Sequence, residues 1–181
     1  MHATRRALLA CLLISLTVAF GYALAGIPNV ELMTMTVFLS GYLLGVRLGI
    51  LVGIVSIGIH ALFNPLGASL PPLLLSQAVG FAVIAAAGAT LGPVIQRFRY
   101  RVAAVILSGA IGFVLTLQYD ILTNIAAYYI VMGEGVSESL WGFVLAGVLF
   151  MGMHIIWNTG LFLLIVKPIL VVLSKYRYEL S

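Results

Sequence analysis

Six apolar stretches, each almost free of charged side chains, are the feature that most constrains the fold of this chain. Only 8% of its 181 residues are charged, against roughly 25% in soluble domains, and the mean hydropathy is +1.21. A soluble chain of this length could not bury so much apolar surface. The predicted fold class is all-α: a polytopic membrane protein with six transmembrane helices in a single domain over residues 1–181. The predicted spans are 6–25, 34–45, 48–63, 72–94, 102–131 and 140–166.

Two of these stretches, 34–45 and 48–63, are shorter than the ~20 residues that a full span needs. The sequence "GVRLG" separates them and contains Arg47. An arginine in the middle of a bilayer is costly, whereas one at a turn is not. We therefore expect a tight helical hairpin here rather than one bent helix.

Lysine and arginine predict the orientation, because they concentrate in cytoplasmic loops. With six spans, all of them fall on one side: Arg5, Arg6, Arg47, Arg97, Arg99, Arg101, Lys167, Lys175 and Arg177. The opposite loops contain Glu31, Asn64, Glu134 and Glu138 and no lysine or arginine. We expect both termini in the cytoplasm of a prokaryotic cell, the protein in the cytoplasmic membrane as a multi-pass protein, and Glu31 outside. The N-terminal stretch resembles a signal peptide but exceeds the usual 7–15-residue apolar core, so we interpret it as a retained helix.

Small residues recur at every fourth position in four of the predicted helices, which places them on one helix face. The first helix has Ala3, Ala7, Cys11, Ser15, Ala19 and Ala23; the hairpin has Gly41, Gly45, Gly49 and Gly53; the fourth has Ala78, Ala82 and Ala86. Such faces let helices approach closely in lipid. Packing inside the bundle explains most of them, and the first helix is the candidate for contact with another membrane subunit.

Polar side chains inside the apolar spans are the candidate binding residues. Asp120 carries the most information, because an aspartate near the bilayer centre costs roughly 2.5–3.5 kcal/mol and must face the interior. We expect an outward-facing pocket with apolar walls and a few directed polar groups. The candidates are Asn29, Glu31, His60, Asn64, Gln77, Asp120, Asn124, Tyr128 and Trp141, with His154 and Asn158 deeper, at the pocket floor.

Each candidate also has a structural explanation. Asp120 and Asn124 could satisfy each other or a nearby histidine, and Glu31 could cap the second helix, where negative charge is favourable. Gln77 could join two helices. Tyr128 and Trp141 could be anchors at the membrane interface, and His154 could be a buried structural histidine.

The charge balance constrains the ligand. The outer half of the predicted bundle has carboxylates and no lysine or arginine, so a neutral or cationic molecule is easier to accommodate than an anion. Aromatic side chains suit a flat heterocycle through stacking or cation–π contact.

Other functions fit the residues less well. Cys11 is the only cysteine, which excludes an intrachain disulfide and a cysteine metal cluster. No Walker-type loop, HExxH spacing or convincing nucleophile–base pair is present, so we expect neither an enzyme nor a metal or other cofactor in this chain. ATP, if used, would be hydrolysed by a partner. A stand-alone small-molecule permease or channel is the main alternative, since His154 and Asn158 extend the polar groups inward.

Four stretches, "PNVELMTMTVFLSGYLLGVRLGILVGIVS", "HALFNPLG", "LTLQYDILTN" and "HIIWNTGLFLL", together with six predicted helices, resemble the substrate-binding S component of an energy-coupling factor (ECF) vitamin transporter. The resemblance covers nearly the whole chain. It implies high-affinity binding of a vitamin or related micronutrient for uptake, with partners that comprise a membrane coupling subunit and two cytosolic ATPases. The chain does not match the pocket signature of the thiamine, riboflavin, biotin or folate members.

The resemblance also implies roles for particular residues. In that family a small-residue pair on the first helix contacts the coupling subunit, and the matching positions here are Ala3 and Ala7, followed by Cys11. The family ligand lies near the outer surface, which implies Asn29, Glu31, Asn64, Gln77, Asp120, Asn124, Tyr128 and Trp141 here. The loaded subunit is then expected to dock and to topple in the membrane, so that its pocket opens inward.

Overall fold

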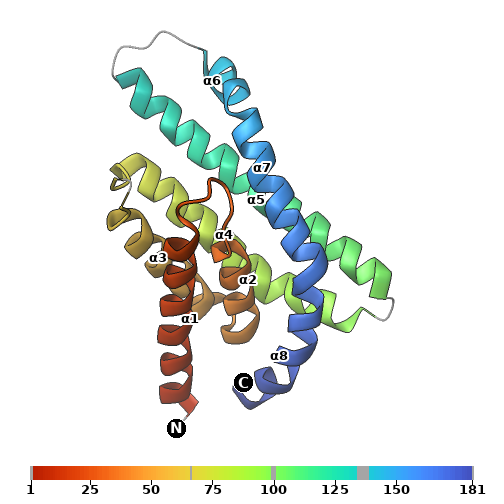
Figure 1. Ribbon diagram of the computed structural model, residues 1–181. Coiled ribbons are helices and arrows are strands. Elements are labelled where there is room, and N and C mark those ends of the chain that lie inside the picture. The colour runs from red at the N-terminus through yellow and green to blue at the C-terminus, as the bar shows by residue number, and fades with distance from the viewer. Residues whose placement is uncertain (1, 66, 99–100, 134–138, 181) are drawn as a thin grey trace.

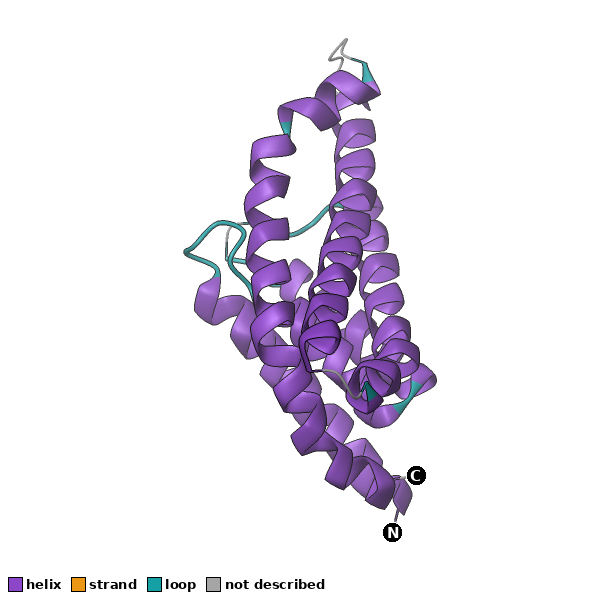
Figure 2. Ribbon diagram, turned by 90° about the vertical axis from the view of Figure 1, so that its right-hand side faces the viewer, coloured by secondary structure: helices purple, strands orange, loops and turns teal. Residues whose placement is uncertain are grey.

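The computed structural model describes residues 2–65, 67–98, 101–133 and 139–180, and these residues form helices and short connections without a strand. The helices are α1 (His2–Leu24), α2 (Met33–Leu44), α3 (Val46–Leu62), α4 (Pro71–Arg97), α5 (Arg101–Gly133), α6 (Leu140–Ala146), α7 (Val148–Leu161) and α8 (Lys167–Leu180), with a π-helical segment, Phe162–Val166, between α7 and α8 (Figure 1). Figure 2 shows that helices make up most of the described chain, with loops between them that include 25–32, 63–65 and 67–70.

Four helical stretches within the described residues are long and apolar enough to cross a membrane. They are Ala3–Leu24, Pro71–Arg97, Arg101–Gly133 and Val148–Tyr176. An all-helical chain with such stretches is suited to a membrane, because an α-helix satisfies its own backbone hydrogen bonds. The described fold is therefore all-α, and its four long apolar helices are consistent with a membrane-embedded protein. The helices α2 and α3 have 12 and 17 residues, so six complete spans stay a prediction.

The expected hairpin between the second and third stretches is present. Only Gly45 separates α2 from α3, and its φ of 80° lies in the left-handed region that favours glycine. The two helices touch directly beside the turn: a methyl group added at Gly49 would lie 2.6 Å from Gly41 Cα.

Helix α2 is the centre of the bundle, and every residue from Met33 to Leu44 is buried. It packs most extensively against α4 and α3. Glycines bring α2 and α4 into backbone contact, since a Cβ at Gly41 would collide with the Ala85 carbonyl and one at Gly88 with the Phe38 carbonyl. A helix that is apolar on all sides is expected to be fully buried. Internal packing thus explains Gly41, Gly49 and Gly53 of the hairpin ladder, and the turn explains Gly45.

The small-residue ladder of α1 points the other way. Ala3, Ala7, Cys11, Ser15, Ala19 and Ala23 are all exposed, whereas Ala10, Leu13, Thr17 and Gly21 face the bundle and are buried. The exposed ladder is called the α1 outer face below.

The last predicted stretch is longer and more broken than the sequence indicated. It begins at Leu140 as expected, is interrupted at Gly147 and passes through the π segment before α8 continues to Leu180. Lys167 was predicted to follow the last span, but it begins α8 and its Nζ lies 2.7 Å from the carbonyl oxygens of Ile95 and Gln96. It thereby satisfies carbonyls at the end of α4, which carry partial negative charge.

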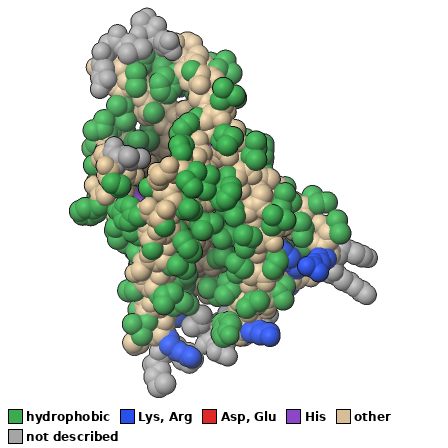
Figure 3. Space-filling view, viewed as in Figure 1, with side chains coloured by type: hydrophobic (Ala, Val, Ile, Leu, Met, Phe, Trp, Pro, Cys, Tyr) green, Lys and Arg blue, Asp and Glu red, His purple; other side chains and the backbone are tan. Residues whose placement is uncertain are grey.

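The described lysines and arginines gather at one end of the molecule. They lie where α1 and α3 begin, where α4 ends and α5 begins, and in α8, and both chain ends are on this side (Figure 1). Figure 3 shows Lys and Arg along the lower and lower-right edge of a largely hydrophobic face. We call this end the cationic rim. Arg99, Glu134 and Glu138, and the side chain of Arg177, lie outside the described residues.

Candidate functional site

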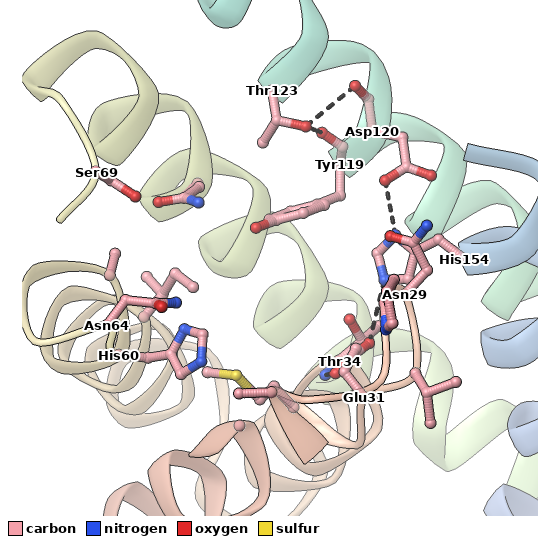
Figure 4. Close-up of a pocket in the computed structure, with 18 of the residues that line it drawn as sticks. Asn29, Glu31, Thr34, His60, Asn64, Ser69, Tyr119, Asp120, Thr123 and His154 are labelled. Atoms are coloured by element: carbon pink, nitrogen blue, oxygen red, sulfur yellow. Dashed lines mark hydrogen bonds and ion pairs between the residues drawn. The ribbon is translucent and has the colours of Figure 1, made fainter. Parts of the chain in front are cut away.

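A cavity of about 460 Å³ opens at the end of the bundle away from the cationic rim. Its walls come from the end of α1, the loop 25–32, the end of α3, the start of α4, the second half of α5 and the first half of α7. Small-molecule sites typically enclose ~300–1,000 Å³, so the volume suits a compact organic molecule. Figure 4 shows the polar side chains around it.

One wall is a cluster of the half-buried Glu31 with the buried Asp120 and His154, here called the carboxylate–histidine cluster. His154 Nδ1 lies 2.7 Å from Asp120 Oδ1, and His154 Nε2 lies 3.5 Å from Glu31 Oε1. Asp120 and His154 are only 6% and 8% exposed. The imidazole therefore bridges a carboxylate from α5 and one from the loop, which is how buried charges remain tolerable.

Both carboxylate oxygens of Glu31 are engaged. Asn158 Nδ2 donates to Oε1 at 2.7 Å, and the Thr34 N–H at the start of α2 donates to Oε2 at 2.8 Å. Burial acts to raise the pKa of the Glu31 carboxyl, but hydrogen bonds from His154 and Thr34 outweigh it and hold that pKa below its usual range. Glu31 thus both caps α2 and joins the cluster, so its two sequence-based explanations are compatible.

Two further hydrogen bonds, one to the loop backbone and one from a loop side chain, join the loop 25–32 to α7. Trp157 Nε1 donates to the Glu31 main-chain oxygen at 2.8 Å, and Asn29 Nδ2 donates to the Phe150 carbonyl at 2.8 Å. Asn29 has a φ of 61°, a left-handed conformation that asparagine tolerates better than most residues. These contacts hold the loop across the cavity as one of its walls.

The facing wall consists of His60, Asn64, Ser69 and Gln77, from α3, the following loop and α4. The ring of Tyr119 projects between the two walls (Figure 4). It packs edge-on against Phe81 with ring centroids 5.5 Å apart and lies 6.0 Å from the His154 ring. The cavity therefore has two polar sides and an aromatic divider.

The structure brings most of the predicted binding residues together. Eight line the cavity: Asn29, Glu31, His60, Asn64, Gln77, Asp120, Asn124 and His154. Asn158 is fully buried behind Glu31 and supports the wall rather than lining it. Whether these residues bind a substrate stays a prediction.

Tyr128 and Trp141 are not brought to the cavity. Tyr128 packs on Tyr129 and Phe143, with ring centroids 5.3 and 5.9 Å away, and Trp141 is 73% exposed. The reason is geometric: the end of α5 and α6 project beyond the other helices (Figures 1 and 2), so these two side chains lie past the cavity.

Sequence reasoning missed several lining residues, namely Phe81, Tyr119, Thr123 and Phe150. Tyr119 precedes Asp120 directly, and a buried aspartate beside an aromatic residue was a usable signal. Thr123 follows Asp120 by three residues and shares its helix face. Phe81 and Phe150 carried no signal, because a lone phenylalanine in an apolar helix is indistinguishable from a lipid-facing one.

Below the cavity the bundle is closed by apolar side chains. Phe38 and Phe162 meet edge-on with ring centroids 5.1 Å apart, and both are fully buried, as are Val166 and Leu170. Nearby buried hydroxyls bond within their own helices, for example Ser40 to the Thr36 carbonyl and Thr116 to the Gly112 carbonyl. No charged side chain among the described residues continues the polar cavity through this layer to the cationic rim.

The described residues contain no group of three His, Cys, Asp or Glu arranged to hold a metal ion. In the carboxylate–histidine cluster both ring nitrogens of His154 already face carboxylates. Comparisons of the chain with protein-family models, with curated proteins and with solved structures give no match.

Proposed function

We propose that this protein is the membrane-embedded binding subunit of an ECF-type uptake system for a vitamin or related micronutrient. The observation that carries the proposal is the cavity: about 460 Å³, open at the end opposite the cationic rim and closed beneath by the Phe38–Phe162 layer. A cavity that is closed beneath can bind a solute but offers it no continuous path through the bundle. The sequence resemblance to S components supplies the rest of the assignment.

The proposal includes an orientation. Lysine and arginine favour the cytoplasmic side, and the described ones share one end of the molecule. The cavity would then open outward from the cytoplasmic membrane, with both termini inside. The α2–α3 hairpin would contribute two short spans, which brings the total to six. Its helix α2 would be shielded from lipid by the other helices.

Docking to the coupling subunit is proposed for the α1 outer face, through Ala3, Ala7 and Cys11. All three are exposed, as a helix-packing surface for another membrane protein requires, and small side chains there permit close backbone approach. The two ATPases bound to that subunit would drive the transport step, since the described residues form a helical membrane bundle without a nucleotide-binding domain.

A stand-alone permease would need a route for the solute past the apolar layer below the cavity. The closed packing of Phe38, Phe162, Val166 and Leu170 supports the binding-subunit proposal over this alternative.

Native mass spectrometry of the detergent-purified protein tests the proposal, combined with affinity purification from its own host. We expect one small organic molecule bound per chain, and co-purification of a membrane protein together with two ATPase subunits. Solute uptake by this chain alone in proteoliposomes, without ATP or a partner, would contradict the proposal and favour the permease.

A further inference from the structure

We infer that the cavity selects an organic cation with a flat apolar body over neutral or anionic molecules of the same shape. This inference rests on the proposed function, because it names the chemical class of the solute bound in the same cavity.

The first argument is the charge of the cavity wall. Its lining includes two carboxylates, Glu31 and Asp120, and no lysine or arginine. The carboxylate–histidine cluster sets two acidic groups against one imidazole, that of His154. A negative charge enclosed without an equal positive partner is unfavourable in a low-dielectric interior. A cationic ligand would supply the missing charge.

The second argument is the hydrogen-bond inventory. Both Glu31 oxygens are occupied by Asn158 and Thr34. Asp120 Oδ2 and Gln77 Oε1, in contrast, are buried acceptor atoms without a hydrogen-bond partner among the described residues. Buried acceptors of this kind are rare unless something else satisfies them. Asp120 and Gln77 line the cavity, but these two oxygens have almost no accessible surface, so an N–H donor on a ligand would reach them only after a side-chain rotation.

The third argument distinguishes an organic cation from a metal ion. The cavity volume of about 460 Å³ far exceeds that of a bare ion. The edge-on pair of Phe81 and Tyr119 lines it, and aromatic faces attract organic cations. The Tyr119 ring projects between the two polar walls, where a flat body would stack.

Three probes of nearly identical shape test the charge preference: benzamidine, benzamide and benzoate, which are cationic, neutral and anionic at pH 7. Isothermal titration calorimetry of the intact, detergent-purified protein measures each Kd. A charge-assisted hydrogen bond exceeds a neutral one by roughly a factor of ten or more in affinity. We expect benzamidine to bind at least about tenfold more tightly than benzamide, and benzoate to bind most weakly.

Substitutions of the two carboxylates test whether the carboxylate–histidine cluster causes the preference for benzamidine. Asp120→Asn should remove the advantage of benzamidine over benzamide, whereas Asp120→Glu, which retains the charge, should keep it. Should Asp120→Asn not fold, Glu31→Gln removes the other carboxylate and is expected to reduce the same ratio. Because the readout is a ratio within one variant, a general loss of stability does not imitate it.

The outcomes separate the two proposals. Benzamide or benzoate binding as tightly as benzamidine would overturn the inference and leave a solute-binding cavity intact. If sodium or potassium chloride alone bound as tightly as benzamidine, the preference for an organic cation would be overturned. Failure of all three probes to bind would also overturn the inference, while native mass spectrometry tests the proposed binding function separately.

Discussion

At the scale of single residues, the buried Asp120 explains much of the site. A carboxylate inside a membrane bundle must find compensation, and here His154 supplies it from α7 at 2.7 Å. Glu31 approaches the same imidazole from a loop that is distant in sequence. One histidine thus ties α5, α7 and the loop 25–32 together around the cavity.

Replacing His154 by leucine should destabilise the protein strongly, because Asp120 would stay buried without its partner. Removing one member of a buried charge pair costs about 3–5 kcal/mol. The double variant Asp120→Leu with His154→Leu should recover part of that loss. Denaturant unfolding in detergent measures the double-mutant cycle, and strictly additive effects of the two substitutions would show that the pair is not coupled.

The lowered pKa of Glu31 predicts how acid affects the loop. A carboxyl with a folded-state pKa below 4.5, its ordinary value, contributes stability that is fully present above that ordinary pKa. The contribution is lost as the pH falls through the lowered folded value. We expect the difference in Tm between wild type and Glu31→Gln to be constant from pH 7 down to about pH 5 and to shrink below it. A difference that grows on acidification would contradict this assignment.

At the scale of elements, the buried helix α2 organises the bundle through its backbone contact with α4. Hydropathy located the six apolar stretches, and the sequence "GVRLG" with Arg47 indicated the hairpin turn, whereas α8 was not predicted. The faces of the helices could not be predicted in the same way, because an apolar helix in lipid has no polar stripe to distinguish inside from outside.

The α2–α4 contact should not tolerate even one methyl group at its closest point. Gly88→Ala would place a Cβ against the Phe38 carbonyl, and overpacking of this kind typically costs about 1–3 kcal/mol or more. The matched control is Gly58→Ala in α3, where nothing lies within 4 Å of the added methyl and helix propensity favours alanine by about 1 kcal/mol. Equal effects of the two substitutions on unfolding would refute the proposed close contact.

The limits of sequence reasoning at the site follow from the same physics. Two signals were enough to predict a polar group in the interior: the spacing of Asp120 and Asn124 on one helix face, and the free-energy cost of placing Asp120 inside a membrane. The contacts between Glu31, Asn158 and Trp157 join positions more than 120 residues apart, and no local pattern encodes them. The break of the last helix into α6, α7, a π segment and α8 also depends on packing against α5.

At the scale of the whole molecule, two features lie at different places: the cavity at one end, and the α1 outer face along one side. The proposed function uses both, since binding and docking would then be separable. The described lysines and arginines lie at the end opposite the cavity, so the cavity would open on the outer side of the membrane in the proposed orientation.

A bulky residue on the α1 outer face should therefore abolish docking without affecting binding. We expect Ala7→Trp to lose co-purification with the coupling subunit and ATPases while the Kd for the solute stays unchanged. The control is Ile106→Trp on α5, which is also an exposed position but on another helix, and this variant should still assemble. Loss of assembly in both variants would indicate a general defect rather than a docking face.

The most direct test of the account is the side of the membrane on which the cavity opens. In a Cys11→Ser background, single cysteines replace Pro65, exposed beside the cavity mouth, or Arg47, exposed at the hairpin turn. We predict that a membrane-impermeant maleimide labels Pro65→Cys in intact cells and Arg47→Cys only after permeabilisation. Labelling of both cysteines from the same side would contradict an outward cavity opposite a cytoplasmic cationic rim.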